Sequence, residues 1–414
     1  MNKRVYLGMS GGVDSSVSAL LLKEQGYDVT GVYMKNWSED LPGMKCPWAE
    51  DLADAKRVAV QLDLDFEVWD FEKDYKAKVV DYMLAEFKKG RTPNPDVMCN
   101  ELIKFKLFYD WALERGADFI ATGHYAQIGS AKNDPSENAA PAKVDLLKAV
   151  DANKDQTYFL YRMSDAATAK TLFPIGAMTK PEVKQLAAAK KLDVATKKES
   201  MGICFVGEVG MKDFLQQYLD AKPGEIREQE TGEVLGYHDG AIFYTIGQRH
   251  GLYLGGGLPY YVVGKDLATN IVYVSKNLNH ESLWTTELTL ESLHLRSGRT
   301  LTDIAKLATE LSRNNQNRLQ VRLRHRAPLI DCKIDGLSER EVAETSIFRG
   351  SPEVTTEDED ARPPRRRAGA TSCPENLEAS AVISFSQPIK RPAPGQSAVL
   401  YSGDICLGGG IIAE

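Results

Sequence analysis

The sequence lacks several features that define familiar classes of protein. Its six cysteines form no C-x-x-C pair, so the sequence indicates neither a zinc ribbon nor a secreted disulfide framework. No apolar run approaches the roughly eighteen residues that a membrane span needs. Only Val5–Leu7 form an apolar run before the first glycine loop, which excludes a signal peptide. We therefore predict a cytoplasmic protein without a membrane anchor.

The balance of charge argues against a uniformly basic nucleic-acid binder. The formal net charge is -7 over 414 residues. Local basic clusters do occur at Lys88–Arg91, Lys197–Lys198 and Arg322–Arg326, so a polyanion can still bind along a stripe. The length exceeds what one hydrophobic core usually supports, and we expect two or three domains.

The most informative stretch that is present is a glycine loop after the apolar run Val5–Leu7. Residues 8–16 read GMSGGVDSS and open into a helical pattern from Val17 to Lys23. Glycines adopt backbone angles closed to other residues, and the loop's N–H and hydroxyl groups converge on the positive end of a helix dipole, so we expect an anion there. The loop lacks the lysine of a Walker-type loop and the G-x-G-x-x-G spacing of a dinucleotide site. The remaining pattern, SGGxDS, resembles the pyrophosphate loop (PP-loop) of enzymes that split ATP into AMP and pyrophosphate, and it predicts adenylation of an oxygen.

Residues 1–204 alternate short apolar runs with helical patterns, which is typical of an α/β domain with a doubly wound parallel sheet. The expected strands are Val5–Leu7, Val29–Tyr33, Phe66–Trp69 and Phe119–Thr122, and the expected helices are Ser15–Gln25, Ala49–Leu62, Tyr75–Lys88 and Lys104–Glu114. Ligands of such sheets bind beyond the carboxyl ends of the strands. The Ser10 loop, Met34 and Gly123 all fall there, and we predict that they mark one nucleotide pocket.

The rest of the chain divides into two smaller parts. Residues 205–272 are rich in glycine and in strand-like patterns, which predicts a small connecting domain. Residues 273–414 contain short alternating strands that predict an antiparallel β-barrel. Within it, residues 336–380 carry an acidic run and an Arg/Pro-rich run with few apolar residues, so we expect a disordered surface insertion.

Two stretches place a cysteine in a reactive setting. In Arg91–Asn100, two prolines stiffen a loop in which Asp96 and Cys99 lie three residues apart, and both face the same way if Asp96 caps the helix that follows. A cysteine near a helix N-terminus has a lowered pKa and is more nucleophilic. In Lys197–Glu208, Cys204 lies in a glycine-flanked and basic setting. Spacing alone leaves open whether the two thiols meet in space.

Seven stretches occur in the order found in bacterial tRNA-specific 2-thiouridylases, which this chain resembles over nearly its whole length. They are Ser10–Ser15, Thr92–Asn100, Ala121–Tyr125, Lys154–Gln156, Gly202–Glu208, Tyr244–Arg249 and Gly395–Gly410. Residues 336–380 are longer than the family usually carries at this place. Glu199 and Met201 also depart from the usual Asp and from the usual small residue or Thr, but they leave Cys204 in place.

The resemblance implies a tRNA-uridine 2-sulfurtransferase that uses ATP with Mg²⁺. ATP would adenylate the C2 oxygen of the wobble uridine in tRNAs for Lys, Glu and Gln, a persulfide on Cys204 would deliver sulfur to C2, and AMP would leave. Uracil C2 is a poor electrophile, and an adenylate leaving group makes the attack of sulfur feasible. Cys99 would then attack the persulfide and form a transient Cys99–Cys204 disulfide that a cellular thiol reduces. Asp96 would act as the general acid/base on the uridine.

The same likeness implies the remaining site residues and partners. The expected ATP-binding residues are Gly8, Met9, Ser10, Gly11, Gly12, Val13, Asp14 and Ser15, with Met34 and Gly123 meeting the adenosine through backbone atoms. The expected tRNA contacts are Asn94, Pro95, Asp96, His124, Lys154, Asp155, Gln156, Arg324, His325 and Gln396. The expected partners are tRNA and a sulfur-donor protein, either a cysteine desulfurase or a sulfur-relay protein. We expect a monomer with no resident metal.

Three alternatives stay open at this point. An iron–sulfur cluster held by Asp96, Cys99 and Cys204 is a less favoured sulfur carrier, while the lack of paired Cys/His spacing disfavours zinc. An amidotransferase-type enzyme uses the same SGGxDS loop to adenylate a substrate for attack by ammonia, but it needs no pair of thiols. A non-catalytic tRNA-binding protein is the third alternative, and the presence of Ser10, Asp14 and Cys204 argues against it.

Overall fold

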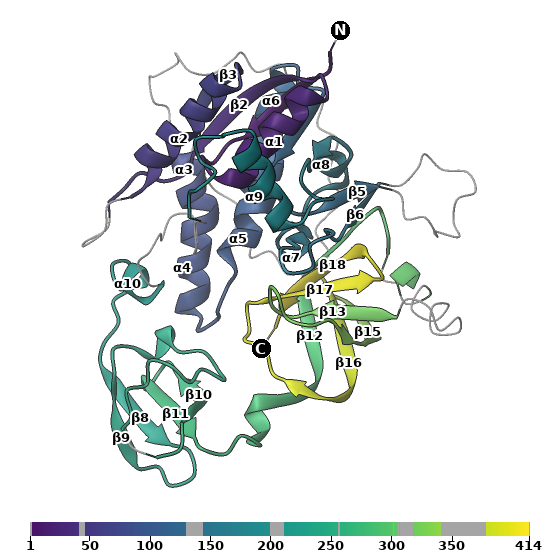
Figure 1. Cartoon of the computed structure of the whole chain (residues 1–414). Helices are drawn as coiled ribbons and strands as arrows, with labels where there is room; N and C mark the ends of the chain where they lie inside the picture. The colour runs from purple at the N-terminus through teal and green to yellow at the C-terminus, as the bar shows by residue number, and fades with distance from the viewer. Residues whose placement is uncertain are drawn as a thin grey trace, which may run out of the picture.

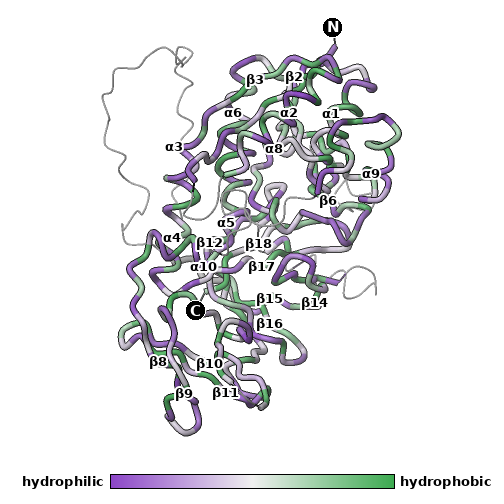
Figure 2. Tube along the Cα trace, turned by 60° about the vertical axis from the view of Figure 1, so that its left-hand side comes forward, coloured by the Kyte–Doolittle hydropathy of each residue, from purple (hydrophilic) through white to green (hydrophobic). Residues whose placement is uncertain are grey.

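The computed structural model describes residues 2–40, 46–129, 144–198, 211–255, 257–300, 302–304, 306, 318–340 and 378–413. These residues form three sheets that follow one another along the chain, from the purple N-terminal part to the yellow C-terminal part in Figure 1. In all three parts, hydrophobic residues occur in short stretches that hydrophilic residues interrupt (Figure 2). Within the described ranges, every helix is too short or too polar to cross a membrane.

The N-terminal part is built on a five-stranded sheet of order β3-β2-β1-β4-β7, in which neighbouring strands run parallel. Its strands are β1 (Arg4–Gly8), β2 (Asp28–Lys35), β3 (Asp65–Asp70), β4 (Phe119–Thr122) and β7 (Thr171–Leu172). After β1, the chain forms β2 and β3 on one side of β1, and β4 then pairs with the other side of β1. The carboxyl ends of β1 and β4 therefore flank the point where the strand order reverses, which is where ligands of such sheets bind.

Helices cover both faces of this sheet, as the alternating apolar pattern requires. Val5 and Leu7 of β1 pack in one core with helices α1 (Val13–Glu24), α2 (Trp48–Gln61) and α9 (Lys180–Ala189). Tyr6 faces the opposite core, which contains the helices that run from Glu72 to Lys88 and from Pro95 to Glu114. The predicted doubly wound sheet is confirmed, and each of the four predicted strands lies within an observed one.

Two of the helices on the second face start earlier than the sequence predicted. The first comprises α3 (Glu72–Tyr75), a π-helical segment η1 (Lys76–Val80) and α4 (Asp81–Lys88). The second comprises α5 (Pro95–Met98), a π-helical segment η2 (Cys99–Phe108) and α6 (Tyr109–Glu114), whereas the prediction began at Lys104. Pro95 at the first helical position and an Asn94 cap explain the earlier start, because both favour a helix N-terminus.

Short elements connect the sheet to the rest of the chain. They are β5 (Gln127–Gly129), β6 (Asp145–Leu147), α7 (Thr157–Leu160), α8 (Asp165–Ala169) and α10 (Met211–Leu215). Strand β6 pairs antiparallel with the C-terminal strand β18 (Ile405–Ile412). The N-terminal part is thus hydrogen-bonded directly to the C-terminal sheet.

The central part is a four-stranded sheet of order β10-β11-β8-β9, at the lower left of Figure 1. Its strands are β8 (Gly224–Glu228), β9 (Val234–His238), β10 (Tyr261–Asp266) and β11 (Ile271–Ser275), with a 3-10 turn η3 (Ala241–Phe243). Ile226, Val262, Val272 and Val274 supply its own small core. This agrees with the predicted small connecting domain.

The C-terminal part is an antiparallel sheet that wraps around a core of Leu290, Val321, Ile383 and Leu407. After the turn η4 (Glu281–Leu283), its strands are β12 (Trp284–Leu295), β13 (Leu319–Arg322), β14 (Ile330–Asp331), β15 (Lys333–Arg340), β16 (Glu378–Lys390), β17 (Ser397–Ser402) and β18. Strands β5 and β6 of the N-terminal part complete this sheet through the pairing of β6 with β18. The prediction of a C-terminal antiparallel barrel is confirmed.

The predicted disordered insertion at residues 336–380 is wrong at both of its ends. Strand β15 continues through Arg340 and β16 begins at Glu378, and these two residues pair in register. Because β15 is the edge strand of the sheet, its ladder can extend without the apolar residues that a central strand needs on its faces. The remaining residues, 341–377, lie outside the described residues.

Candidate functional site

The glycine loop forms the predicted strand–loop–helix unit at the carboxyl end of β1. Helix α1 begins at Val13 after Gly12, and no side chain caps it. The Ser15 hydroxyl donates to the Gly12 carbonyl at 3.1 Å and accepts from the Ser10 N–H at 3.3 Å, which folds the loop over the start of the helix. The first N–H groups of an uncapped helix are donors for an anion, and the helix dipole favours negative charge there.

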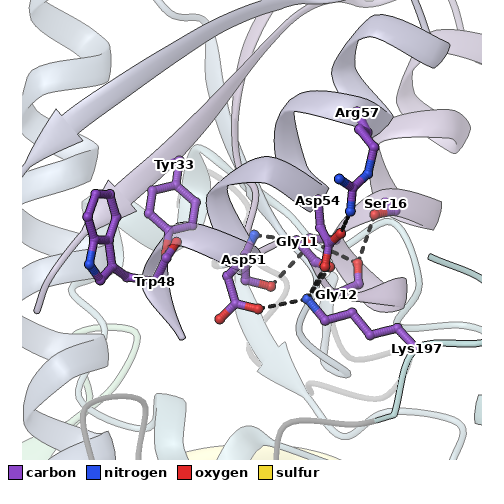
Figure 3. Close-up of polar contacts among 11 residues, drawn as sticks. Gly11, Gly12, Ser16, Tyr33, Trp48, Asp51, Asp54, Arg57 and Lys197 are labelled. Carbon is purple, nitrogen blue, oxygen red and sulfur yellow. Dashed lines mark hydrogen bonds and ion pairs between the residues drawn. The ribbon is translucent and has the colours of Figure 1, made fainter. Parts of the chain in front are cut away.

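The loop is held from outside by α2 and by Lys197. Gly11 has a φ of +71°, and a Cβ added to it would lie 2.2 Å from the Asp51 carbonyl oxygen, so only glycine fits this approach. The Lys197 ammonium lies 3.2 Å from the Gly11 carbonyl oxygen and 2.7 Å from Asp51 Oδ1, and it also contacts Asp54 (Figure 3). Lys197 therefore joins the glycine loop to the start of α2.

Backbone contacts bring the other two predicted nucleotide residues to the same place. A Cβ added to Gly123, just after β4, would lie 2.7 Å from the Ser15 nitrogen, so the chain after β4 passes close to the start of α1. A Cβ added to Gly8 would lie 2.8 Å from the Met34 methyl carbon. Gly8, Met34 and Gly123 thus gather around the loop at the ends of three adjacent strands.

Asp14 has two partners that sequence reasoning missed. Its Oδ1 accepts a hydrogen bond from the Tyr125 hydroxyl at 2.8 Å and one from the Lys180 ammonium at 2.7 Å, and Lys180 also reaches Oδ2 at 2.9 Å. Tyr125 is the last residue of the Ala121–Tyr125 motif, so the sequence did mark the stretch in which it lies. Lys180 belongs to none of the motifs. The Tyr125 N–H in turn donates to Gln156 Oε1 at 2.8 Å, which links the Lys154–Gln156 motif to the loop.

The loop with Asp96 and Cys99 starts a helix, but Asp96 does not cap it. Asn94 is the cap, and its side-chain oxygen accepts from the Asp96 N–H at 3.2 Å. Asn94 is better placed because the rigid Pro95 follows it at the first helical position. Asp96 therefore lies one position after Pro95 and Cys99 directly follows this first turn, with 4% of its surface exposed.

The electrostatic setting of Asp96 involves Lys104, which the sequence analysis did not single out. Burial raises the pKa of Asp96 above its usual value, and the positive charge of Lys104 opposes this shift. Burial also lowers the pKa of His124 well below its usual value, with Lys104 adding to the effect. His124 is held by a 2.8 Å contact between its Nδ1 and the Thr122 hydroxyl. The charge of Lys104 thus affects the pKa of both Asp96 and His124.

Residues of the other two parts of the chain hold the start of this loop. The Thr92 N–H donates to the Pro394 carbonyl at 2.8 Å, and Gln396 Nε2 donates to the Thr92 carbonyl at 2.7 Å. The Thr92 hydroxyl lies 3.1 Å from the Thr245 hydroxyl of the central part. A Cβ added to Gly395 would lie 3.0 Å from the Thr92 nitrogen, and the φ of Gly395 is +88°. Residues of the Tyr244–Arg249 and Gly395–Gly410 motifs therefore both contact Thr92 and hold the start of the loop that carries Asp96 and Cys99.

Asp155, predicted as a tRNA contact, is a buried link to the C-terminal sheet. It is 2% exposed, and its Oδ2 lies 2.6 Å from the Arg322 guanidinium. The Thr157 hydroxyl donates to both carboxylate oxygens at 2.9 Å and also lies 3.0 Å from the Tyr401 hydroxyl. The Asp155 carboxylate is therefore directed into the protein, where it fixes the turn between Lys154 and Gln156.

His325, another predicted tRNA residue, lies beside α7, and Arg324 precedes it in the chain. The His325 ring lies 4.5 Å from the Phe159 ring, and burial together with the charges of Arg326 and Arg322 lowers the pKa of His325 to about 4. Arg324 is exposed. A neutral imidazole and an aromatic ring beside an exposed arginine can stack on a base and contact a phosphate.

The second predicted catalytic cysteine, Cys204, lies outside the described residues, as does the rest of the Gly202–Glu208 motif. The proposed disulfide between Cys99 and Cys204 therefore stays a prediction. Among the residues that the structure describes, no group of three or more His, Cys, Asp or Glu side chains is arranged to hold a metal ion. Because Cys204 is not among them, the iron–sulfur alternative stays open.

Three further cysteines are poor candidates for sulfur chemistry. Cys46, Cys332 and Cys406 are all buried. Burial raises the pKa of the Cys46 thiol, that of Cys332 to about 12 and that of Cys406 to about 11. Since the thiolate is the nucleophile, a raised pKa makes each of these three thiols less reactive near neutral pH than an exposed cysteine.

Three family models match the chain. They are described as the tRNA methyl transferase HUP domain over residues 3–208, the tRNA methyl transferase PRC-barrel domain over residues 212–276 and the Aminomethyltransferase beta-barrel domain over residues 364–412. The matched ranges follow the same order as the three sheets of the structure.

Full-length relatives cover almost the whole chain. A protein named tRNA-specific 2-thiouridylase MnmA from Listeria monocytogenes is 43% identical over 412 residues, which span 99% of this chain and 94% of that protein. A protein of the same name from Enterococcus faecalis is 42% identical over 418 residues, which span 99% and 95%. A solved complex of a 4-thiouridine synthetase with RNA and bound ATP is 18% identical, covers 52% of this chain and 50% of that one, and has a TM-score of only 0.33.

Proposed function

This chain belongs to the family of tRNA-specific 2-thiouridylases, and we propose that its glycine loop, the Asp96–Cys99 loop and Cys204 carry successive steps of one ATP-dependent thiolation of tRNA. The observation that carries the proposal is the shared setting of the first two loops. Lys104 acts electrostatically on Asp96 and on His124, and His124 directly follows Gly123, whose backbone approaches Ser15. These contacts support the proposal that the acid/base group and the nucleotide loop serve the same site.

The first step is adenylation of the uridine. The C2 oxygen of the wobble uridine attacks the α-phosphorus of ATP, the bond from this phosphorus to the bridging oxygen breaks, and pyrophosphate leaves with the electron pair. Asp96 takes the N3 proton of the uridine, and its raised pKa makes its carboxylate a stronger base than an exposed aspartate. The start of α1 holds phosphate oxygens. Mg²⁺ would accompany the ATP and neutralise charge on its phosphate oxygens, which are ligands that this ion prefers.

The second step is sulfur transfer. The terminal sulfur of a Cys204 persulfide attacks C2, and the C2–O bond breaks with release of AMP. The Cys99 thiolate attacks the Cys204 sulfur, so that a Cys99–Cys204 disulfide forms and the transferred sulfur stays on the uridine. A cellular thiol then supplies the two electrons that reduce the disulfide.

The tRNA would lie across α7 and the adjoining C-terminal sheet. We propose that Lys154, Arg324 and His325 contact it directly, and that Asn94 and Pro95 line the uridine pocket with Asp96. Asp155, Gln156, His124 and Gln396 would then support this surface from within. Gln156 and Gln396 bond to backbone groups of Tyr125 and Thr92, and Asp155 and His124 contact the side chains of Arg322 and Thr122. The tRNA set would be that for Lys, Glu and Gln.

The proposed reaction also requires a protein that loads Cys204 with sulfur, a cysteine desulfurase or a sulfur-relay protein. We propose that the chain acts as a cytoplasmic monomer with the domain division 1–204, 205–272 and 273–414. Three hydrophobic clusters, one each in the N-terminal, central and C-terminal parts, support this division. A fourth cluster, on the other face of the N-terminal sheet, joins two of the parts, because it also includes Val399, Tyr401 and Cys406 of the C-terminal sheet.

Mass mapping of the loaded protein tests the assignment of the thiols. After incubation with a desulfurase and cysteine, the extra sulfur should be found on Cys204, and Cys204→Ser should lose it. Cys99→Ser should keep the extra sulfur but lose thiolation of tRNA. Cys406→Ser, at a buried thiol with a pKa of about 11, serves as the control and should thiolate like the unaltered protein.

Two results would contradict this scheme. Extra sulfur on Cys46, Cys332 or Cys406 would reassign the donor. Thiolation by anaerobic, iron-loaded protein together with none by iron-free persulfidated protein would replace the persulfide with an iron–sulfur carrier.

A further inference from the structure

A buried lysine from a distant helix lies at the start of the glycine loop's helix. Lys180 is 7% exposed, and its ammonium lies 2.7 and 2.9 Å from the two carboxylate oxygens of Asp14. Asp14 is the second residue of α1, so this positive charge lies within one turn of the helix N-terminus that faces the anion site. The same ammonium lies 5.9 Å from the centre of the Tyr125 ring.

The backbone of Lys180 is fixed by an unusually complete set of contacts. Lys180 is the first residue of α9, and Thr179 and Glu182 form a capping box around it. The Lys180 N–H donates to Asp151 Oδ2 at 2.9 Å. The side chain therefore projects from a rigid helix start toward Asp14, which is the arrangement expected of a preorganised group.

A purely structural role for this pair is a poor explanation. Helices α1 and α9 already share an exposed ion pair, because the Lys190 ammonium lies 2.7 Å from Glu24 with both side chains nearly half exposed. Burying an ammonium carries a large desolvation penalty that an exposed pair avoids. The SGGxDS loop, moreover, contains no lysine of its own. Lys180 therefore provides a buried positive charge at this loop, which the loop's own sequence does not provide for binding a polyphosphate.

We propose that Lys180 is the phosphate-binding cation of the glycine loop. In this proposal, which rests on the proposed function, the Lys180 ammonium contacts oxygens of the pyrophosphate part of ATP, and Asp14 and Tyr125 hold it in position. As the α-phosphorus–oxygen bond breaks and negative charge grows on the departing pyrophosphate, this interaction strengthens, so Lys180 stabilises the transition state more than bound ATP.

The comparison of ATP with AMP tests the proposal, because AMP lacks the pyrophosphate part. We expect Lys180→Met to weaken ATP binding about tenfold or more while leaving AMP binding unchanged, since a charge-assisted hydrogen bond contributes about 1.5–3 kcal/mol. The rate of AMP and pyrophosphate formation with tRNA should fall roughly 100- to 1,000-fold, as for loss of one transition-state donor. Lys180→Arg, which keeps the charge, should retain part of the binding preference for ATP.

Lys190→Met is the matched control, because it removes an ion pair between the same two helices at their other ends. It should change neither the ratio of ATP to AMP affinity nor the rate by more than about twofold, in line with an exposed pair. If Lys180→Met does not fold, Lys180→Gln, which can still donate to Asp14, gives the same comparison.

An unchanged ratio of ATP to AMP affinity in folded Lys180→Met or Lys180→Gln would overturn the assignment, whether both affinities are retained or both fall by the same factor. If the unaltered protein bound ATP but formed no AMP with tRNA, the proposed function would fail, and the affinity ratio would still decide the role of Lys180.

Discussion

Gln396 Nε2 donates a hydrogen bond of 2.7 Å to the carbonyl oxygen of Thr92, a residue 304 positions earlier in the chain. Thr92 opens the loop that carries Asp96 and Cys99, and its N–H donates to the Pro394 carbonyl. The C-terminal sheet therefore holds the loop whose side chains the proposed chemistry uses. This contact couples the C-terminal sheet to the Asp96–Cys99 loop.

Replacing Gln396 by Ala should slow thiolation without weakening ATP binding. Loss of the side-chain donor leaves the Thr92 carbonyl without this bond, and a misplaced reacting group costs up to about 100-fold in rate. We expect the kcat of tRNA thiolation to fall at least about tenfold, measured as 2-thiouridine formed per minute at saturating ATP and tRNA.

Gln320→Ala is the control for this measurement. Gln320 also donates from the C-terminal sheet, at 2.9 Å, but to the exposed Asp331 within the same sheet. The Gln320→Ala variant should thiolate tRNA at the rate of the unaltered protein. Equal rates for the Gln396→Ala variant and the unaltered protein would show that the contact does not position the loop.

The pH dependence of thiolation should report on Asp96. Burial raises the pKa of Asp96 and Lys104 opposes this shift, and the proposed base must be deprotonated. The rate should therefore rise with pH through the pKa of Asp96, above the range of an exposed aspartate. Lys104→Met removes the opposing positive charge, so the acid limb of the kcat profile should move to higher pH.

Lys106→Met is the matched control for Lys104→Met. Lys106 belongs to the same helix but is exposed and lies 3.1 Å from Asp110, so its loss should leave the acid limb in place. An acid limb that moves to lower pH in Lys104→Met, or equally in both variants, would contradict the role given to Asp96.

The ion pair between Asp155 and Arg322 should dominate the stability of the contact between the N-terminal part and the C-terminal sheet. Both side chains are almost fully buried. Asp155→Asn leaves the arginine charge buried and unpaired, so we expect a loss of about 3 kcal/mol or more in the free energy of unfolding. Urea denaturation followed by fluorescence measures it.

Asp331→Asn removes the carboxylate of an exposed pair with Arg318 and should change stability by less than about 1 kcal/mol. Similar losses for the two variants would mean that the buried pair contributes no more than an exposed one.

The segment 341–377 should be dispensable for activity. Arg340 and Glu378 pair in register, so a two-residue Asn-Gly turn can join them as a hairpin. The shortened protein should thiolate tRNA at a rate within about twofold of the full chain, with a shallower salt dependence of binding because Arg362–Arg367 are gone. A deletion variant with an unchanged melting profile that loses most of its tRNA-dependent rate would show that the segment takes part in recognition.

The parallel sheet could be predicted from the sequence because local patterns specify it. Apolar runs such as Val5–Leu7 and Val29–Tyr33 lie between helical patterns, and the glycine loop follows the first of them. The start of the helix before Cys99 was predicted too late, because its first turn depends on Asn94 and Pro95 rather than on apolar spacing. The ends of the insertion were also misjudged, since ladder hydrogen bonds extend β15 through polar residues.

Long-range partners could not be predicted in the same way. Lys180 lies 166 residues from Asp14, and Arg322 lies 167 residues from Asp155. Nothing near Lys180 in the sequence marks it as different from any lysine at a helix start. Asp155 was expected on a tRNA surface because its motif suggested one, and only the fold reveals that its carboxylate faces the protein interior.

Mass spectrometry of the wobble nucleoside tests the central claim most directly. Unmodified tRNA for Lys, Glu or Gln is incubated with the purified protein, ATP, Mg²⁺ and a persulfide-loading system, and the nucleoside and nucleotide products are measured together. The account predicts 2-thiouridine at the wobble position with one AMP and one pyrophosphate for each sulfur transferred, and none with Cys204→Ser. Formation of ADP and phosphate, or AMP formation without any 2-thiouridine, would contradict it.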